Sequence, residues 1–120
     1  MNPSLVVKLT WGAESPERVS QALSVATTAL ALGGDVSLWL AGEASSLAQP
    51  GVLEQVELEF APPLVTLLNA LLHAEAVNVC AQCAARRGIT ADSLLSGSRI
   101  AGTATFVEQV LRPDARVLVY

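Results

Sequence analysis

The sequence predicts one α/β domain over residues 1–120, in which an open, mainly parallel five-stranded sheet forms the middle of a three-layer α/β/α arrangement. Short apolar segments alternate with segments whose apolar residues recur at helical spacing. This pattern is typical of a parallel sheet covered on both faces. The length fits one domain with its own hydrophobic core, and no repeat, low-complexity tract or linker divides the chain.

The first quarter of the chain predicts a strand, a helix and a second strand. The first strand is about Leu5 to Leu9. Ser15-Pro16-Glu17 then combines an N-cap residue, a proline at the first helical position and an acid in the first turn. Gly33-Gly34 ends this helix because glycine readily adopts the left-handed cap conformation. The second strand is about Asp35 to Ala41.

The next segment is the hardest to assign from its pattern. We expect a short helix near Ala44 to Ala48 and a turn at Pro50-Gly51. The run from Val52 to Phe60 fits either helix or strand. A proline pair then opens a strong helix of about Pro63 to His73.

The second half continues the alternation. A third strand, about Ala76 to Val79, ends at Cys80, and a short helix follows from about Ala81 to Arg87 and stops at Gly88. Thr90 is expected to cap a short turn that runs through Leu95.

The last three elements are a strand, a helix and a final strand. We expect the strand at about Arg99 to Ala101 and a helix at about Ala104 to Leu111, with Thr103 as its cap. Pro113 stops this helix, and the last strand is about Arg116 to Tyr120. The helix residues expected to face inward are Phe106, Val107, Val110 and Leu111.

The composition predicts an oligomer. Hydrophobic residues make up 52% of the chain and charged residues 15%, against about 25% charged in average globular domains. So few charges suggest that another subunit covers part of the surface. We therefore expect a homo-oligomer, with Leu64 to Leu72 and Val52 to Phe60 as candidate interface segments.

Charge and hydropathy argue against nucleic acid and membrane partners. The net charge is −4 with only seven Lys and Arg residues, so no general basic field is present. The start, Met1-Asn2-Pro3-Ser4, lacks the basic region and long apolar region of a secretory signal. No apolar run reaches the length of about 18 residues that a membrane helix needs. We expect a cytoplasmic protein with reduced cysteines.

Cys80 is the first candidate for reactive chemistry. Ligands of open α/β sheets bind beyond the carboxyl ends of the strands, where Cys80 falls. The backbone N–H groups of a helix start also favour thiolate, which is the nucleophilic form of cysteine. The alternative is structural, because free cysteine is among the most buried residue types.

Cys83 completes a C-x-x-C pattern with Cys80. This spacing places both sulfurs on one side of the first helical turn and allows a local disulfide. A metal is not expected, because two cysteines supply half of a tetrahedral zinc site and His73 is the only histidine. His73 itself fits a structural role at the end of an apolar helix.

Other residues are candidates to support the cysteines. Arg86 and Arg87 either face an anion or a partner, or satisfy the carbonyl groups of the helix end. Further candidates follow the first and fourth strands, so they belong to the same edge of the sheet: Trp11, Gly12, Gly102 and Thr103. No cofactor is expected, because the chain has neither a G-x-G-x-x-G pattern nor a Walker lysine.

The segment from Val77 to Ile89 resembles the signature of the DsrE/DsrF/TusD family. That signature is a strand ending in cysteine, a short alanine-rich helix, then Arg-Arg-Gly and an aliphatic residue. Four positions match it one by one: Cys80, Arg86, Arg87 and Gly88. The order of elements is similar along nearly the full chain.

The resemblance implies a five-stranded parallel sheet between helices and assembly into trimers or hexamers. It also implies a sulfur relay, in which the cysteine that corresponds to Cys80 takes persulfide sulfur from a donor protein and passes it to an acceptor. The chain departs from this pattern at Cys83, where relay members carry a small apolar residue. A second thiol can attack a persulfide on Cys80, releasing sulfide and leaving a disulfide.

Three functions remain open from the sequence. The first is a sulfur carrier or sulfurtransferase-like protein without independent catalytic turnover, in which Cys80 bears the persulfide and Cys83 resolves it. In this reading Arg86 or Arg87 favours the anion or docks a partner. The second is a dithiol redox or sensor protein that cycles between reduced Cys80/Cys83 and their disulfide. The third is an oligomeric binding module whose cysteines are inert.

Overall fold

The computed structural model describes residues 3–120; Met1 and Asn2, which enter the prediction about the N-terminus, lie outside the described residues. Five strands form one parallel sheet in the order β4-β3-β2-β1-β5. The predicted fold class is confirmed, and the structure adds the strand order that the sequence left open. The strands are β1 (Ser4–Leu9), β2 (Asp35–Leu40), β3 (Val77–Cys80), β4 (Ser98–Ala101) and β5 (Ala115–Val119).

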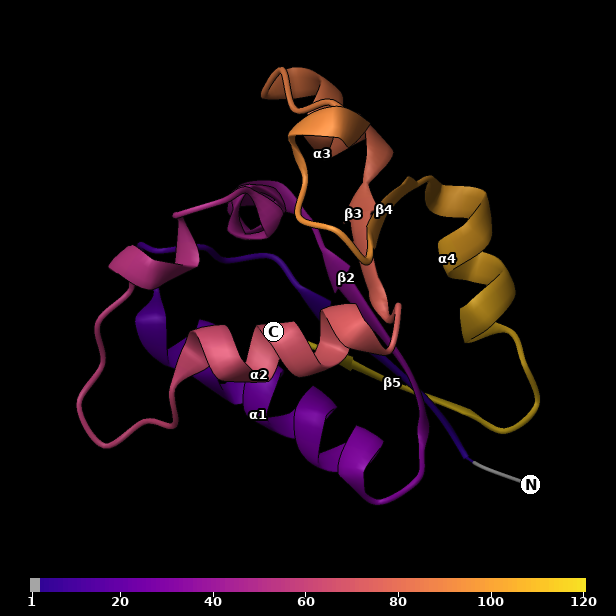
Figure 1. Cartoon of the computed structure of the whole chain (residues 1–120). Helices are drawn as coiled ribbons and strands as arrows, with labels where there is room; N and C mark the ends of the chain where they lie inside the picture. The colour runs from indigo at the N-terminus through magenta and orange to yellow at the C-terminus, as the bar shows by residue number, and fades with distance from the viewer. Residues whose placement is uncertain (1–2) are drawn as a thin grey trace.

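The helices form the two outer layers of the domain. Helices α1 and α2 lie together over one face of the sheet, and α4 lies over the other face (Figure 1). Helix α3 follows β3 directly, beyond the carboxyl end of that strand. The α-helices are α1 (Pro16–Ala31), α2 (Leu64–His73), α3 (Ala81–Arg86) and α4 (Thr103–Val110); short 3₁₀ helices are η1 (Gly42–Ala48), η2 (Leu53–Gln55) and η3 (Ala91–Ser93).

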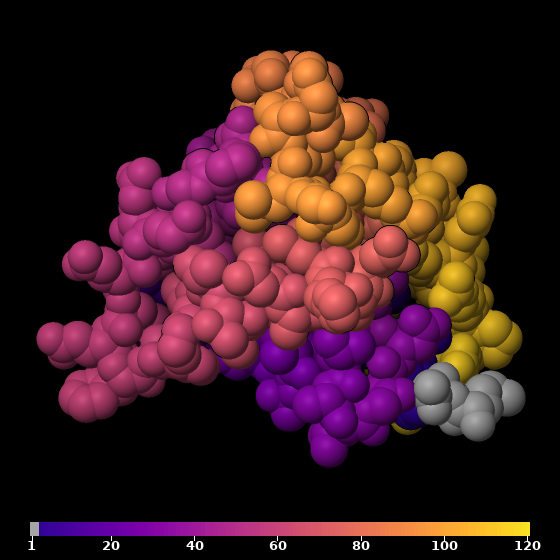
Figure 2. All heavy atoms as spheres, in the orientation of Figure 1, coloured from indigo at the N-terminus to yellow at the C-terminus, as the bar shows by residue number. Residues whose placement is uncertain are grey.

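The main hydrophobic core lies between the sheet and the α1–α2 layer. Side chains of a strand alternate between its two faces, so Val7 and Leu9 of β1 meet Val19 and Leu23 of α1, each at most 1% exposed. Burying a side chain of this size contributes about 1.5–3 kcal/mol. Helix α2 and the segment after α3 pack against each other on the side drawn in Figure 2, where the residues before α2 project from the edge.

The segment after β2 agrees with the sequence prediction in its first part and differs from it in its second part. The short helix expected near Ala44 to Ala48 is present as η1, which begins at Gly42. Gly42 has a φ of +55°, a conformation that favours glycine. The run from Val52 to Phe60 is neither one helix nor one strand, because it forms η2 and then an irregular segment.

The prediction for α4 is wrong at its cap and on part of its inward face. Gly102 holds the N-cap position and Thr103 is already helical. Val107 and Leu111 are 41% and 75% exposed, whereas Gln109 is 6% exposed. The reason is polar: the indole N–H of Trp39 donates a hydrogen bond of 2.8 Å to the side-chain oxygen of Gln109, which turns this side of the helix toward the sheet.

The apolar face of helix α2 packs against the core of the same chain. Leu64 to Leu72, a candidate interface from the sequence, directs four of its five leucines into the chain's own core: Leu64, Leu68, Leu71 and Leu72. Across residues 3–120, no helix is both long enough and apolar enough to cross a membrane.

Candidate functional site

The carboxyl ends of the parallel strands meet at one edge of the sheet. Cys80 ends β3 and pairs in register with Ala101 of β4, while Ala41 and Gly42 follow β2 directly. Gly102 and Thr103 follow β4 in the same way. The structure therefore brings three of the predicted site residues together at the edge where open α/β sheets bind ligands.

A small cavity of about 60 Å³ lies at this edge, on the face of the sheet that α4 covers. Cys80, Gly102 and Thr103, all predicted from the sequence, line it. Its other lining residues were not among the predicted site residues: Lys8, Trp39, Ala41 and Phe106. A space of this size accepts a few atoms at most. It suits a terminal sulfur atom or a small anion better than a nucleotide or a peptide side chain.

Two aromatic rings form the wall between the sheet and α4. The ring centroids of Trp39 and Phe106 lie 5.3 Å apart in an edge-to-face arrangement. The Lys8 ammonium nitrogen lies 5.0 Å from the Phe106 centroid. The hydrogen bond between Trp39 and Gln109 fixes α4 above these rings. The cavity thus has rigid apolar walls, one thiol and one cation.

The sequence prediction missed Lys8, although its position in an apolar strand could have identified it. It is the one charged residue in the apolar strand segment Leu5 to Leu9. Charged side chains are rarely buried unless they are paired. A lysine in the middle of such a strand therefore marks a polar feature on that face of the sheet.

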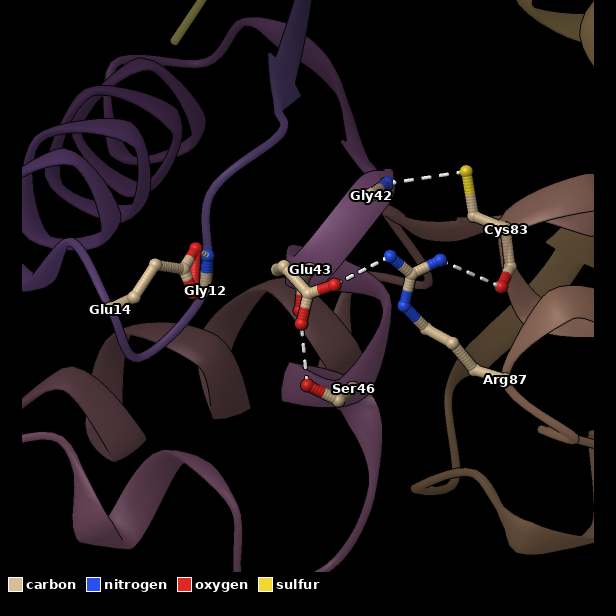
Figure 3. Close-up of polar contacts among 7 residues, drawn as sticks. All are labelled: Gly12, Glu14, Gly42, Glu43, Ser46, Cys83 and Arg87. Carbon is tan, nitrogen blue, oxygen red and sulfur yellow. Dashed lines mark hydrogen bonds and ion pairs between the residues drawn. The ribbon is translucent and has the colours of Figure 1, made fainter.

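Cys83 occupies a different environment from Cys80. Its sulfur accepts a hydrogen bond of 3.2 Å from the backbone N–H of Gly42 (Figure 3). Burial raises the pKa of the Cys83 thiol, but the Gly42 N–H, the Cys80 thiol and the charges of Arg86 and Arg87 act the other way. The resulting pKa lies below its ordinary value.

This arrangement differs from the expectation for the helix start. The sequence led us to expect backbone N–H groups of the helix after Cys80 to favour thiolate at Cys80. In the structure the amide that binds a sulfur is Gly42, from the β2–η1 junction, and the sulfur is that of Cys83. Both cysteines are free thiols and both are partly buried. Nothing in the local sequence around Cys83 indicates Gly42, which lies 41 positions away along the chain.

Arg87 connects α3 to η1. Its guanidinium donates to Glu43 Oε1 at 2.7 Å and to the Cys83 carbonyl oxygen at 3.1 Å (Figure 3). The hydrogen bond with Glu43 is the main cause that raises the pKa of Arg87. The helix-end role expected for the arginines therefore applies to Arg87. Arg86 is exposed and acts on Cys83 through its charge.

Trp11 and Gly12 lie apart from the cavity lining. The Arg18 guanidinium stacks 4.3 Å above the Trp11 ring, which is 41% exposed. Gly12 lies against η1, where a Cβ on it would come within 2.7 Å of the Glu43 carbonyl oxygen. Gly12 thus supports the segment that carries Gly42.

The described residues contain no group of three or more His, Cys, Asp and Glu side chains that could hold a metal ion. His73 lies at the end of α2, where it lines a separate open hollow with Glu75 and Gly97. This hollow is near the amino ends of β3 and β4, at the opposite edge of the sheet from Cys80.

Comparison with protein families assigns the chain to a family. The model of the DsrE/DsrF-like family matches residues 4–120. The chain belongs to the DsrE/DsrF-like family. This confirms the resemblance seen in the segment from Val77 to Ile89, and it relates the chain in general to sulfur relay.

A solved structure and the curated proteins complete the comparison. The fold is similar to that of the ychN protein from E. coli, with a TM-score of 0.80 and 21% identity over 100% of both chains. At this identity the likeness shows the fold alone. No curated protein matches the sequence.

Proposed function

We propose that this family member carries sulfur as a persulfide on Cys80, receiving it from a donor protein and passing it to an acceptor. The observation that supports this most is the position of Cys80 in a small cavity at the carboxyl edge of the sheet. The cavity has room for one added sulfur atom and excludes bulky groups. Membership of the DsrE/DsrF-like family is in keeping with this chemistry.

Sulfur uptake is a simple displacement. The Cys80 thiolate attacks the outer sulfur of a donor persulfide, R–S–SH. A bond forms between the Cys80 sulfur and that outer sulfur, the S–S bond of the donor breaks, and the donor leaves as the thiolate R–S⁻. Transfer to an acceptor thiolate repeats the same exchange with Cys80 as the leaving group.

Cys83 is proposed as the resolving thiol. Its lowered pKa increases the fraction present as thiolate at neutral pH. This thiolate attacks the Cys80 sulfur of the persulfide, forms a Cys80–Cys83 disulfide and releases HS⁻. Arg86 and Arg87 favour the Cys83 anion, and Arg86, being exposed, is also available to dock a partner protein.

The working form is proposed to be a cytoplasmic homo-oligomer, a trimer or a hexamer. The chain acts as a relay without independent catalytic turnover. Support comes from the edge strand β5, whose residues Val117, Leu118 and Val119 are 37%, 41% and 64% exposed. An apolar edge strand is normally covered by another element or chain. Phe60, fully exposed in the other candidate interface segment, is a second such side chain.

A dithiol redox or sensor function is the second candidate. Its support is the C-x-x-C spacing of the two free thiols together with the lowered pKa of Cys83, to which the Cys80 thiol contributes. In this function the two thiols lose two hydrogens to an oxidant and form a disulfide, with no sulfur carried.

The intact mass of the protein separates these functions. Wild type, Cys80→Ser and Cys83→Ser are incubated with a cysteine desulfurase and cysteine, without reductant. A gain of one sulfur that is lost in Cys80→Ser and retained or increased in Cys83→Ser supports the carrier. No gain in any variant, with a loss of two hydrogens under mild oxidant, favours the redox function. No change under either treatment leaves an inert binding module.

A further inference from the structure

Lys8 is the only ionisable side chain besides Cys80 among the residues that line the cavity. It pairs in register with Trp39 of β2 and with Val119 of β5. Its side chain lies on the face of the sheet that α4 covers, since it reaches Phe106 of that helix. The ammonium group lies over Phe106. An ammonium held over a ring gains about 0.5–2 kcal/mol.

No carboxylate of the described residues forms an ion pair with Lys8, since the two ion pairs present join Arg87 to Glu43 and Arg112 to Asp35. Asn78 holds Arg99 through a hydrogen bond of 2.7 Å, and Glu108 of α4 is exposed. Within residues 3–120, the cavity therefore contains a cation that forms no ion pair with an anionic side chain. The other ionisable groups on the surrounding elements are Asp35 of β2, Glu43 of η1, Cys83, Arg86 and Arg87 at α3, Arg99 of β4, Glu108 of α4, and Arg116 and Tyr120 at β5.

The start of α4 adds to the positive character of the cavity. Gly102 and Thr103 line the cavity, and no side chain caps the first turn of this eight-residue helix. The free N–H groups of a helix start carry partial positive charge. A cation, a helix start and a thiol thus converge on a space that holds only a few atoms.

We propose that Lys8 is a catalytic residue of this site, whose ammonium group stabilises the negative charge on the terminal sulfur of a Cys80 persulfide. This inference rests on the proposed carrier function. After uptake, the Cys80–S–SH group releases its proton to solvent, and the resulting Cys80–S–S⁻ pairs with Lys8. The ligand of the cavity is therefore a small sulfur anion attached to the chain. Its charge leaves the cavity when the terminal sulfur moves to an acceptor.

The test compares alkylation of the loaded protein over a pH series. Cys83→Ser is the parent, because it lacks the resolving thiol. It is loaded with the desulfurase and cysteine, freed of donor and treated with iodoacetamide, and the alkylated persulfide is followed by intact mass. Lys8→Met keeps the apolar stem and removes the charge, Lys8→Gln keeps polarity without charge, and Lys8→Arg keeps the charge. Circular dichroism of each variant verifies that it is folded.

We expect both uncharged variants to take up sulfur but to raise the midpoint of the pH profile by about one unit or more, because a nearby opposite charge shifts a pKa by about 1–3 units. Alkylation at a pH below the midpoint then slows about tenfold or more. Lys8→Arg should keep the parent midpoint. Normal uptake with an unchanged midpoint in Lys8→Met and Lys8→Gln would overturn the role of Lys8 alone. No uptake by the parent itself would overturn the carrier function, and the role of Lys8 with it.

Discussion

Removing one partner of the hydrogen bond between Trp39 and Gln109 should destabilise the fold, because the other partner is left buried without a hydrogen bond. Both side chains are buried, at 3% and 6% exposed, and the indole nitrogen lies 2.8 Å from the glutamine oxygen. Trp39→Phe keeps an aromatic ring but removes the donor, so the Gln109 oxygen loses its partner. An unsatisfied buried polar group costs about 1–3 kcal/mol, and the smaller ring adds a cavity cost.

The magnitude can be expressed as a shift of the melting temperature. Unfolding entropy is about 2.1 cal/mol/K per residue near 60 °C, so this chain of 120 residues loses about 4 °C for each kcal/mol. Trp39→Phe should lower Tm by about 4–12 °C. Gln109→Met leaves the indole N–H unsatisfied and should cost a similar amount.

A double-mutant cycle tests the reasoning directly. The variant that carries both changes has no unpaired group, so its loss of unfolding free energy should fall short of the summed single losses by about 1–3 kcal/mol. Trp39→Phe combined with Val107→Ala is the matched control, because Val107 lies on the exposed side of α4. That pair should be additive. Additivity of the Trp39 and Gln109 changes within about 0.5 kcal/mol would refute the role assigned to this hydrogen bond. All variants are measured at one protein concentration, since assembly makes Tm concentration-dependent.

Two further predictions concern the segment that binds Cys83. Gly12→Ala should lower the unfolding free energy, measured in urea, by about 1–3 kcal/mol, because its Cβ would meet the Glu43 carbonyl oxygen at 2.7 Å. Ala13→Ser, at an exposed neighbouring position, is the control. Equal stability of the two variants would contradict the close approach. The lowered pKa of Cys83 predicts that its alkylation in Cys80→Ser reaches half of its maximal rate at a lower pH than in the same chain unfolded in urea. The same shift makes the unfolding free energy rise with pH between the folded pKa of Cys83 and the higher pKa of the unfolded thiol. This stabilisation is lost as the pH falls through the folded pKa. A slope that persists in Cys83→Ser would show that another group causes it.

The sequence predicts the fold well because its signals are local. Most strands are short and rich in apolar residues, and the helix ends carry residues whose backbone preferences are known, such as Pro16 and Gly33. The failure at α4 has a long-range cause. Its apolar residues give an inward face by spacing alone, but the indole N–H of Trp39 turns Gln109 inward instead. Trp39 lies 70 positions earlier in the chain than Gln109.

In the candidate site, too, local signals were predictable from the sequence and long-range contacts were not. Cys80, Gly102 and Thr103 could be placed at one edge because parallel strands all end there. The partners of these residues come from other strands, so the spacing of the C-x-x-C pattern does not reveal them. Gly42 reaches Cys83 only because β2 lies beside β3 in the sheet. Lys8 reaches the cavity only because β1 and β2 are neighbours and α4 crosses their face.

The two cysteines of one C-x-x-C pattern therefore meet different neighbours, which bears on whether a carrier can keep its sulfur beside a second thiol. Cys80 lines the cavity with Lys8, whereas Cys83 is bound by the Gly42 N–H and influenced by two arginines. A thiolate becomes a weaker nucleophile as its pKa falls. Cys83 must also give up the Gly42 hydrogen bond to attack the Cys80 sulfur. At neutral pH the larger thiolate fraction of Cys83 outweighs this loss of nucleophilicity. In the proposed carrier, only the hydrogen bond that Gly42 must release therefore slows resolution and favours delivery of the sulfur to an acceptor over its loss as sulfide.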